Sequence, residues 1–369
     1  MRLLQKECGK CLRHPFLWIV CITFGLFQFL SIYTYVGNAG MRKELRQMHV
    51  AVTDEETASP EYESAYADYK KTYGGMYDTL DMRKILEQKE KMSGYEPQGV
   101  WGSWIVRNYD RLQKRVEQIR KTGEGTYDFY PGSWYKLHTT LYGKLWKKLI
   151  LQTAVLMILS MLYLMDYERI YKTQDLVLAT TTGKKMMEKK MLAGALCGLF
   201  YAGLLTAFTL LVFFAAVPFQ NLWHVPVAAC MVAEPRLQMM YPFVTFWRLE
   251  QWRYLLLALV VLVGLLGIVA AVTAAVQLFL QNSYFSFAVL SLLFMGAYLL
   301  AYVQMGNVWD LIRELFNPTV LYVTSGGWFM ENDLCLSFAG NEFAVLFCSG
   351  TAAVCLMAVG KRRYHRLEV

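Results

Sequence analysis

The chain has 369 residues, of which 56% are hydrophobic and only 18% are charged. This composition is more apolar and less charged than that of an ordinary soluble domain, which disfavours a soluble globular protein. The net charge of +8 also does not indicate a nucleic-acid-binding protein, because much of the excess lies beside long apolar runs.

The first 14 residues place apolar side chains at helical spacing with four basic residues between them. This pattern predicts a short amphipathic helix in the cytoplasmic membrane interface, and a frayed basic terminus is the alternative. A charge-free run follows, and residues 15–37 are predicted to form the first transmembrane helix. The run is too long for a signal-peptide core, so we expect it to be retained as an anchor.

Residues 38–147 change abruptly to a composition rich in charge, Tyr and Trp, and predict a mainly helical extracellular insert. Residues 60–92 suit a solvent-facing helical pair broken at Gly74 and Gly75. Residues 103–121 are predicted to form a stronger helix, whose apolar side chains recur at three- and four-residue steps and indicate packing. These side chains are Ile105, Tyr109, Leu112, Val116 and Ile119.

The remaining residues, 148–369, are predicted to contain five further transmembrane helices. One charge-free run, from 254 to 309, is about twice the length that a single span needs, and we divide it at the polar Gln281, Asn282 and Ser283. The predicted spans cover residues 149–165, 191–217, 254–280, 284–305 and 343–360. The fold class is therefore an all-α polytopic membrane protein with six transmembrane helices.

Basic clusters precede the first span, lie in the segment 166–190 between the second and third spans, and follow the last span. Six spans place all three clusters on one side, and basic residues favour the cytoplasm. We therefore expect a cell-membrane protein with both termini cytoplasmic. The opposite segment, 306–341, is acidic, and its residues 309–316 are predicted to form a re-entrant or interfacial helix before Pro318.

Polar and small residues inside the spans are predicted to serve helix packing. Polar side chains would form helix-to-helix hydrogen bonds, and small residues would let helices approach closely. The polar residues are Thr206, Thr209, Thr273, Gln277, Ser286 and Ser291, and the small residues are Gly194, Gly198, Ala202, Gly264, Gly267 and Ala271.

Several familiar chemistries are absent from the sequence. It contains no phosphate-binding loop of the GxxxxGK[ST] type and no HExxH pair, so we predict no catalytic, metal or cofactor-binding residues in this chain. The predicted spans also lack paired carboxylates for ion coupling, so energy would come from elsewhere. Cys8 and Cys11 form a CxxC without further ligands, and Cys230 and Cys335 would both lie outside and could pair.

The segment 166–190 reads DYERIYKTQDLVLATTTGKKMMEKK. Its residues 171–179 suit a short helix that docks into a groove of a cytoplasmic partner. A solvated basic loop is the alternative, and composition does not decide between the two.

The order of residues in this segment resembles a motif of the membrane subunits of ABC-type exporters, the ABC-2 type permease family. An acidic residue is followed by a Gly-Thr-like pair, an apolar triplet, a Thr-rich turn, a basic residue and a Lys that enters the third span. This chain departs from the family at Lys172, where Gly is common, at Lys184, where Arg is common, and by lacking a Pro in the turn. The matching residues are Glu168, Lys172 and Thr173, Leu176 to Leu178, Thr180 to Thr182, Lys184, and Lys189 or Lys190.

The resemblance implies a coupling helix that seats on a separate ABC ATPase subunit, with two ATPase copies and a second permease copy or a homologous permease in the complex. ATP and Mg would be bound by the ATPase and not by this chain. The implied role is export of a peptide, lantibiotic, drug or lipid-like amphiphile in a bacterium. The implied coupling residues are Glu168, Thr173, Leu176, Val177, Leu178, Thr180, Thr181, Lys184 and Lys185.

Two other classes of function stay open. A membrane sensor or scaffold protein would use the insert to bind a ligand or partner without transport. A membrane-embedded enzyme acting on lipid is disfavoured, since His, Asp and Glu do not cluster near either predicted interface. A neighbouring ATPase gene would discriminate in favour of the permease.

Overall fold

The computed structural model describes most of the chain, and nearly all of the described part is helical. Within the described part, six helices are long and apolar enough to cross a membrane, which confirms the prediction of a multi-pass membrane protein. Their bounds are Pro15–Val36, Lys136–Met165, Met186–Ala216, Gln251–Leu280, Ser283–Leu300 and Asn341–Tyr364. The described residues are 2–38, 40–43, 45, 60, 63–64, 67–68, 71, 75–93, 99–125, 136–173, 183–217, 219, 222–230, 244–303, 308–331 and 338–367.

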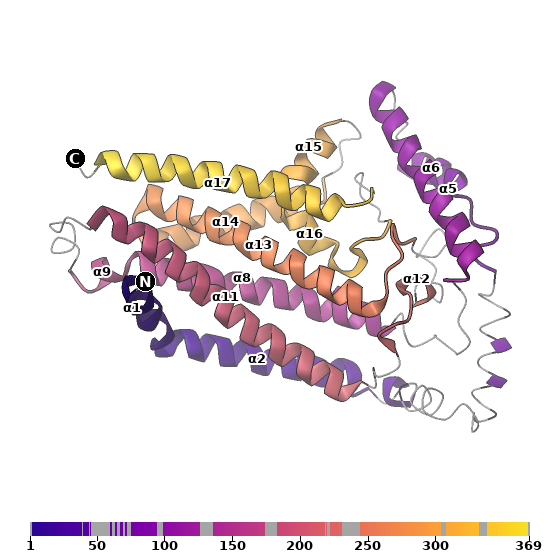
Figure 1. Ribbon diagram of the computed structural model, residues 1–369, viewed down its shortest axis with the longest axis horizontal. Helices are drawn as coiled ribbons and strands as arrows, with labels where there is room; N and C mark the ends of the chain where they lie inside the picture. The colour runs from indigo at the N-terminus through magenta and orange to yellow at the C-terminus, as the bar shows by residue number, and fades with distance from the viewer. Residues whose placement is uncertain are drawn as a thin grey trace.

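The elements follow one another along the chain as helices and short helical turns, and Figure 1 shows the long ones side by side as a bundle. No strand occurs in the described ranges. The elements are α1 (Arg2–Leu12), α2 (Pro15–Val36), α5 (Met82–Ser93), α6 (Gly99–Thr122), the π-helix η1 (Thr139–Leu145), α8 (Trp146–Met165), α9 (Tyr167–Ile170), α11 (Gly183–Ala216), α12 (Val227–Cys230), α13 (Gln251–Leu280), α14 (Ser283–Leu300), α15 (Val308–Phe316), α16 (Thr319–Val323), the 3-10 turn η3 (Ser325–Gly327) and α17 (Asn341–Leu367).

The bundle has two distinct ends. Figure 1 shows α1, α9 and the C-terminus at one end, which we call the α1 end, and α5, α6 and α12 at the other, which we call the insert end. The long apolar run divides where Gln281 adopts a left-handed backbone (φ +50°) and the Asn282 side chain caps α14 by accepting from the Phe285 N–H at 3.1 Å. The polar triplet therefore forms the turn that its composition predicts.

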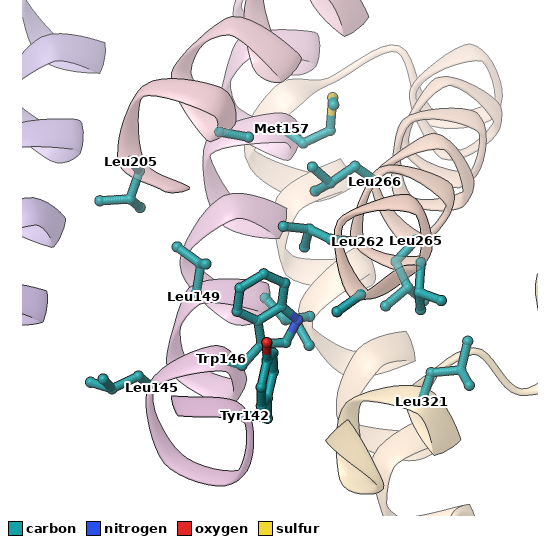
Figure 2. Close-up of a cluster of buried hydrophobic side chains, with 14 of the residues drawn as sticks. Tyr142, Leu145, Trp146, Leu149, Met157, Leu205, Leu262, Leu265, Leu266 and Leu321 are labelled. Atoms are coloured by element: carbon teal, nitrogen blue, oxygen red, sulfur yellow. The ribbon is translucent and has the colours of Figure 1, made fainter. Parts of the chain in front are cut away.

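Helix α8 lies at the centre of the bundle and packs against α2, α11 and α13, while α17 packs along α13. Trp146 at its start is fully buried. Figure 2 shows Tyr142 and Trp146 among the same buried side chains as Leu262 and Leu265 of α13. Burial of such large apolar groups against neighbouring helices holds the spans together by dispersion contacts, since lipid offers no hydrophobic driving force between them.

Close helix packing is confirmed at two of the predicted glycines. A Cβ added to Gly194 or Gly198 would lie 3.0 Å from the α-carbon of Met161 or Met157 on α8, so only glycine lets α11 approach α8 this closely. At Gly264 an added Cβ would meet the Leu346 side chain at 2.8 Å. The same prediction is wrong for Gly267, where nothing lies within 4 Å.

The prediction of helix-to-helix hydrogen bonds by the span hydroxyls is wrong for four of them. Each donates to the carbonyl four residues earlier in its own helix, a local bond that any Ser or Thr can form. One hydrogen bond between spans is made instead by the Gln28 amide, which donates to the side-chain oxygen of Gln152 at 2.8 Å and joins α2 to α8. The four self-bonded residues are Thr206, Thr209, Thr273 and Ser291.

The insert packs against the connection between α11 and α13. The predicted apolar stripe of α6 is buried there together with Met82 and Ile85 of α5, which confirms that the stripe serves packing. The Tyr77 hydroxyl donates to the Ala228 carbonyl of α12 at 3.1 Å. The buried Arg115 of α6 donates to the Thr245 carbonyl at 3.2 Å and pairs with Glu124. The insert is thus attached to the bundle by apolar and polar contacts.

Candidate functional site

The connection between α8 and α11 begins with a buried carboxylate. Glu168, on α9, forms ion pairs with Lys10 of α1, at 3.3 Å, and with Lys190 of α11. Lys10 also pairs with Glu7 at 2.6 Å. Glu7, Glu168 and Lys190 are each less than a tenth exposed. Two acidic and two basic side chains from three elements therefore form one buried ion-pair cluster.

The end of α8 is attached to a fourth element. Asp166 follows the last residue of α8, and its carboxylate accepts from the Ser283 hydroxyl at 2.7 Å and from the Ser283 N–H at 3.3 Å. Ser283 is the first residue of α14. Because a carboxylate favours N–H groups at a helix N-terminus, this contact joins α8 to the turn between α13 and α14.

Aromatic and backbone contacts complete the site. The Lys10 ammonium lies 4.5 Å from the centre of the Tyr167 ring, which in turn packs against Tyr171 at 4.5 Å. The Thr173 N–H donates to the Glu168 carbonyl at 2.8 Å. Lys172, which precedes Thr173, has a φ of +56°. This left-handed conformation costs free energy for a residue that carries a Cβ atom. The chain therefore turns sharply at Lys172, just after the end of α9.

The structure brings together only part of the predicted coupling residues. Glu168 is in the ion-pair cluster, and Thr173 is half-buried and bonded to it through the backbone. Lys184 and Lys185 lie in the first turn of α11, but their side chains are outside the described structure. The other predicted residues, Leu176, Val177, Leu178, Thr180 and Thr181, lie outside the described residues, as does Cys335 of the suggested pair with Cys230.

Sequence reasoning missed the other members of the cluster. Glu7 and Lys10 are three residues apart on the amphipathic α1, a spacing that brings opposite charges together on a helix. Lys190 ends the family-like motif, so it was identified by position but not as the partner of Glu168. Nothing in the sequence alone indicates that α1 lies against α9 and α11.

The arrangement can hold elements together. Its titratable groups are paired with one another, and the described part of the chain contains no group of three His, Cys, Asp or Glu side chains that could hold a metal ion. A buried ion pair resists separation, because breaking it leaves an uncompensated charge away from water. The cluster is suited to transmitting displacement between α9, α1 and α11.

The chain matches no family model, no curated protein and no solved structure. Assignment of a function depends on the topology of the chain, on the contacts around Glu168 and on the motif in the segment 166–190.

Proposed function

We propose that this chain is the permease subunit of an ATP-driven ABC transporter that exports a peptide, lantibiotic, drug or lipid-like amphiphile. It works with two ABC ATPase subunits and a second permease copy or a homologous permease. The six apolar helices and the motif in residues 166–190 are the features that support this function. The α1 end faces the cytoplasm of the cell membrane, where the ATPase binds.

The observation that carries the proposal is the buried position of Glu168. Its pairs with Lys10 and Lys190 join the start of the coupling segment to α1 and to the third span. A displacement applied to the segment after Glu168 is therefore passed to α11 through a buried charge pair. These ion pairs hold the start of the segment 166–190 in place. A freely solvated basic loop would not need such buried contacts.

The backbone at Lys172 supports the same assignment. The ABC-2 type permeases resembled by this sequence commonly have Gly at the position of Lys172, and glycine adopts positive φ without penalty. Lys172 retains the positive φ, at +56°, although it carries a side chain. A left-handed backbone, which glycine adopts readily, is therefore present at the position where those permeases commonly have Gly.

In this function, ATP binding closes the partner ATPases and moves the docking triplet Leu176 to Leu178. The movement shifts an equilibrium between states that give access to one side of the membrane or the other. This chain supplies the pathway and the coupling segment, and hydrolysis takes place in the partner. The insert, at the opposite end of the bundle from α1, contributes selectivity for cargo or partner.

The experiment that tests the proposal is co-purification with ABC ATPases from the same genome, beginning with any encoded beside this chain. Val177→Asp places a charge in the docking triplet, so we expect it to abolish ATPase association and ATP-driven efflux while the permease remains folded. Gln118→Asp, at an exposed position on α6, introduces the same charge and is expected to leave ATPase association unchanged. Failure of every ATPase to associate, or full efflux by the Val177→Asp variant, would overturn the assignment.

A membrane sensor or scaffold is the second candidate, because the insert is attached to the loops that precede α13 and α17. Lys89 of α5 pairs with the buried Glu331, and the Tyr109 hydroxyl of α6 donates to the same carboxylate at 3.4 Å. A ligand bound by the insert could move these loops without any ATPase. Ligand-dependent changes in a chain that binds no ATPase and supports no efflux would favour this function.

A further inference from the structure

Two lysines near the start of α8 meet one tyrosine at the end of α2. The Lys144 ammonium lies 5.1 Å from the centre of the Tyr35 ring, and the Lys148 ammonium lies 4.8 Å from the same centre. Lys144 belongs to the π-helix η1, and Lys148 follows it by about one helical turn. We call Tyr35, Lys144 and Lys148 the lysine site. It lies at the insert end of the bundle, where α2 ends and α8 begins (Figure 1).

The Lys148 ammonium is held in a defined position at this site. It donates to Ser31 Oγ and to the Tyr35 hydroxyl, each at 3.0 Å, and lies 5.2 Å from the centre of the Phe27 ring. Ser31 is buried, so α2 fixes the ammonium from the side of the bundle. All of these partners are neutral, and they use two of the three N–H donors of the ammonium group. The third donor is left for another acceptor.

The lysine site carries two positive charges without an acidic partner. No Asp or Glu side chain in the described ranges forms an ion pair with Lys144 or Lys148. By contrast, Lys10, Lys89 and Lys190 are also shielded from water, and each pairs with a glutamate. Two ammonium groups beside one ring repel each other, and apolar surroundings strengthen that repulsion. An anion at this position would compensate both charges.

The surroundings of the lysine site are those of a surface that faces lipid. On α2, Phe27 and Leu30 precede Tyr35 and are 50% and 59% exposed, and on α8 Leu151 follows Lys148 and is 40% exposed. Exposed apolar side chains on a membrane-spanning helix contact acyl chains. Tyr35 is in the last turn of α2, at the level where aromatic rings meet lipid head groups. A lipid therefore reaches this face from the bilayer without any opening of the bundle.

We propose that the lysine site binds the phosphate of an anionic phospholipid. The two ammonium groups donate to the non-bridging phosphate oxygens, while the acyl chains lie along the exposed side chains of α2 and α8. A free phosphate ion gains only the first of these contacts. A zwitterionic lipid has the same phosphate but also carries a cation, which the two lysines repel. The site therefore selects lipids with a net negative charge, and this selection is independent of the proposed ATPase partnership.

Binding is measured by native mass spectrometry of the full chain in detergent, titrated with phosphatidylglycerol or with phosphatidylcholine of the same acyl chains. We expect the first phosphatidylglycerol to bind at least about tenfold more tightly than the first phosphatidylcholine. Inorganic phosphate at the concentration of the lipid should not displace it, because phosphate lacks acyl chains. Equal affinity for the two lipids would overturn the proposal. Displacement by inorganic phosphate would also overturn it and would indicate a site for free anions.

Two double variants test whether the lysines select the lipid. Lys144→Gln with Lys148→Gln removes both charges, so we expect phosphatidylglycerol to bind no more tightly than phosphatidylcholine. Lys144→Arg with Lys148→Arg keeps both charges and should keep the preference, since guanidinium groups also bind phosphate. A preference that persists in the Gln variant would overturn the proposal. Loss of the preference in the Arg variant would overturn it as well, because altered packing would then explain both results.

A control pair distinguishes this site from a general attraction of basic residues to anionic bilayers. Arg362 and Arg366 are exposed, lie four residues apart on α17 and are at the α1 end of the bundle. Arg362→Gln with Arg366→Gln removes the same charge as the lysine variant and should leave the preference for phosphatidylglycerol unchanged. An equal loss of preference in this control would mean that net charge, and not the lysine site, attracts the lipid.

Discussion

Glu168 is the residue on which the ion-pair cluster depends, since it is paired with two lysines from different elements. Glu168→Gln leaves Lys190 charged and buried without a full counter-charge, and we expect a loss of about 3–5 kcal/mol in the free energy of unfolding. Thermal unfolding of the purified protein, followed by loss of helical circular dichroism, measures the change. Adding Lys190→Met to Glu168→Gln should recover part of the loss, because the unpaired charge is then removed.

A surface ion pair provides the control for Glu168. Arg83 and Asp110 lie 2.8 Å apart in the insert, and their side chains are exposed. Hydrogen bonding to Arg83 lowers the pKa of Asp110 from its ordinary value, but solvent screens such a pair. Asp110→Asn should leave the unfolding temperature unchanged within error. An equal effect of Glu168→Gln and Asp110→Asn would show that burial of the cluster does not contribute to stability.

Cys8 on α1 lies outside the spans, and burial raises the pKa of its thiol to about 11. Only the thiolate reacts with iodoacetamide, so at neutral pH the folded protein holds Cys8 in its unreactive form. We expect alkylation of Cys8 to be on the order of a hundredfold slower than that of glutathione, and to rise about tenfold per pH unit up to that pKa. Quantitative mass spectrometry of the Cys8 peptide measures the rate, and fast labelling at neutral pH would contradict the burial of this thiol.

At the scale of elements, contact between α8 and α11 depends on glycine. Gly198→Ala would place a Cβ 2.5 Å from the Met157 sulfur and 3.0 Å from its α-carbon, so the two helices must separate. We expect a loss of about 1–3 kcal/mol in the free energy of unfolding, as for other overpacked cores. Gly203→Ala, on the same helix with nothing within 4 Å, should instead be neutral or raise stability by about 0.5–1 kcal/mol through helix propensity. Similar changes in the free energy of unfolding for Gly198→Ala and Gly203→Ala would contradict the close approach of α11 to α8.

The attachment of the insert is a second property of elements. Arg115 joins α6 to the Thr245 carbonyl and is paired with the buried Glu124. Arg115→Met removes these bonds while keeping apolar volume, so we expect faster amide hydrogen exchange in α6 and at residues 244–250 but not in α13. Arg83→Met, at an exposed pair of the same insert, is the control and should leave exchange at 244–250 unchanged. Equal amide exchange at residues 244–250 in the Arg115→Met and Arg83→Met variants would mean that Arg115 does not hold the insert.

The elements also show which features a sequence can predict. Charge-free runs mark the spans because a bilayer excludes charge along a whole helix, and helical spacing marks the buried stripe of α6 because one face packs. Both signals are local. The prediction of hydrogen bonds between helices is wrong for Thr206 and Thr209, because each hydroxyl donates to a carbonyl of its own helix. The residue type alone does not show which of these two bonds a hydroxyl forms.

The interior and the sites depend on contacts that are distant in sequence. Glu342 directly follows the acidic segment 306–341 in the sequence, and the structure buries it in the first turn of α17 beside Phe329. The positive φ of Phe329 and the π-helix η1 have no sequence signature of their own. Likewise, Lys10 and Glu168 are 158 residues apart and meet only because α1 folds against α9. Motif order identified Glu168, and packing alone identified its partners.

At the scale of the whole molecule, the two candidate sites lie at opposite ends of the bundle. The ion-pair cluster is at the α1 end, and the lysine site is at the insert end, where α2 ends and α8 begins. Helix α8 connects them, since η1 precedes it and α9 follows it. A shift of α8 along or about its axis would therefore affect both ends, which is the property that a coupled pathway requires.

This arrangement predicts the orientation of the chain. An even number of spans places both termini on one side, and the basic residues of α1, α11 and the end of α17 favour the cytoplasm for that side. A protease added to intact cells should leave tags at both termini uncut, and a membrane-impermeant maleimide should label a cysteine placed at the exposed Gln118 of α6. A cysteine at the exposed Arg366 of α17 is the matched control and should be labelled only after the cells are opened. Labelling of Arg366→Cys in intact cells would place the Glu168 cluster outside, beyond reach of any cytoplasmic ATPase, and would exclude the proposed coupling.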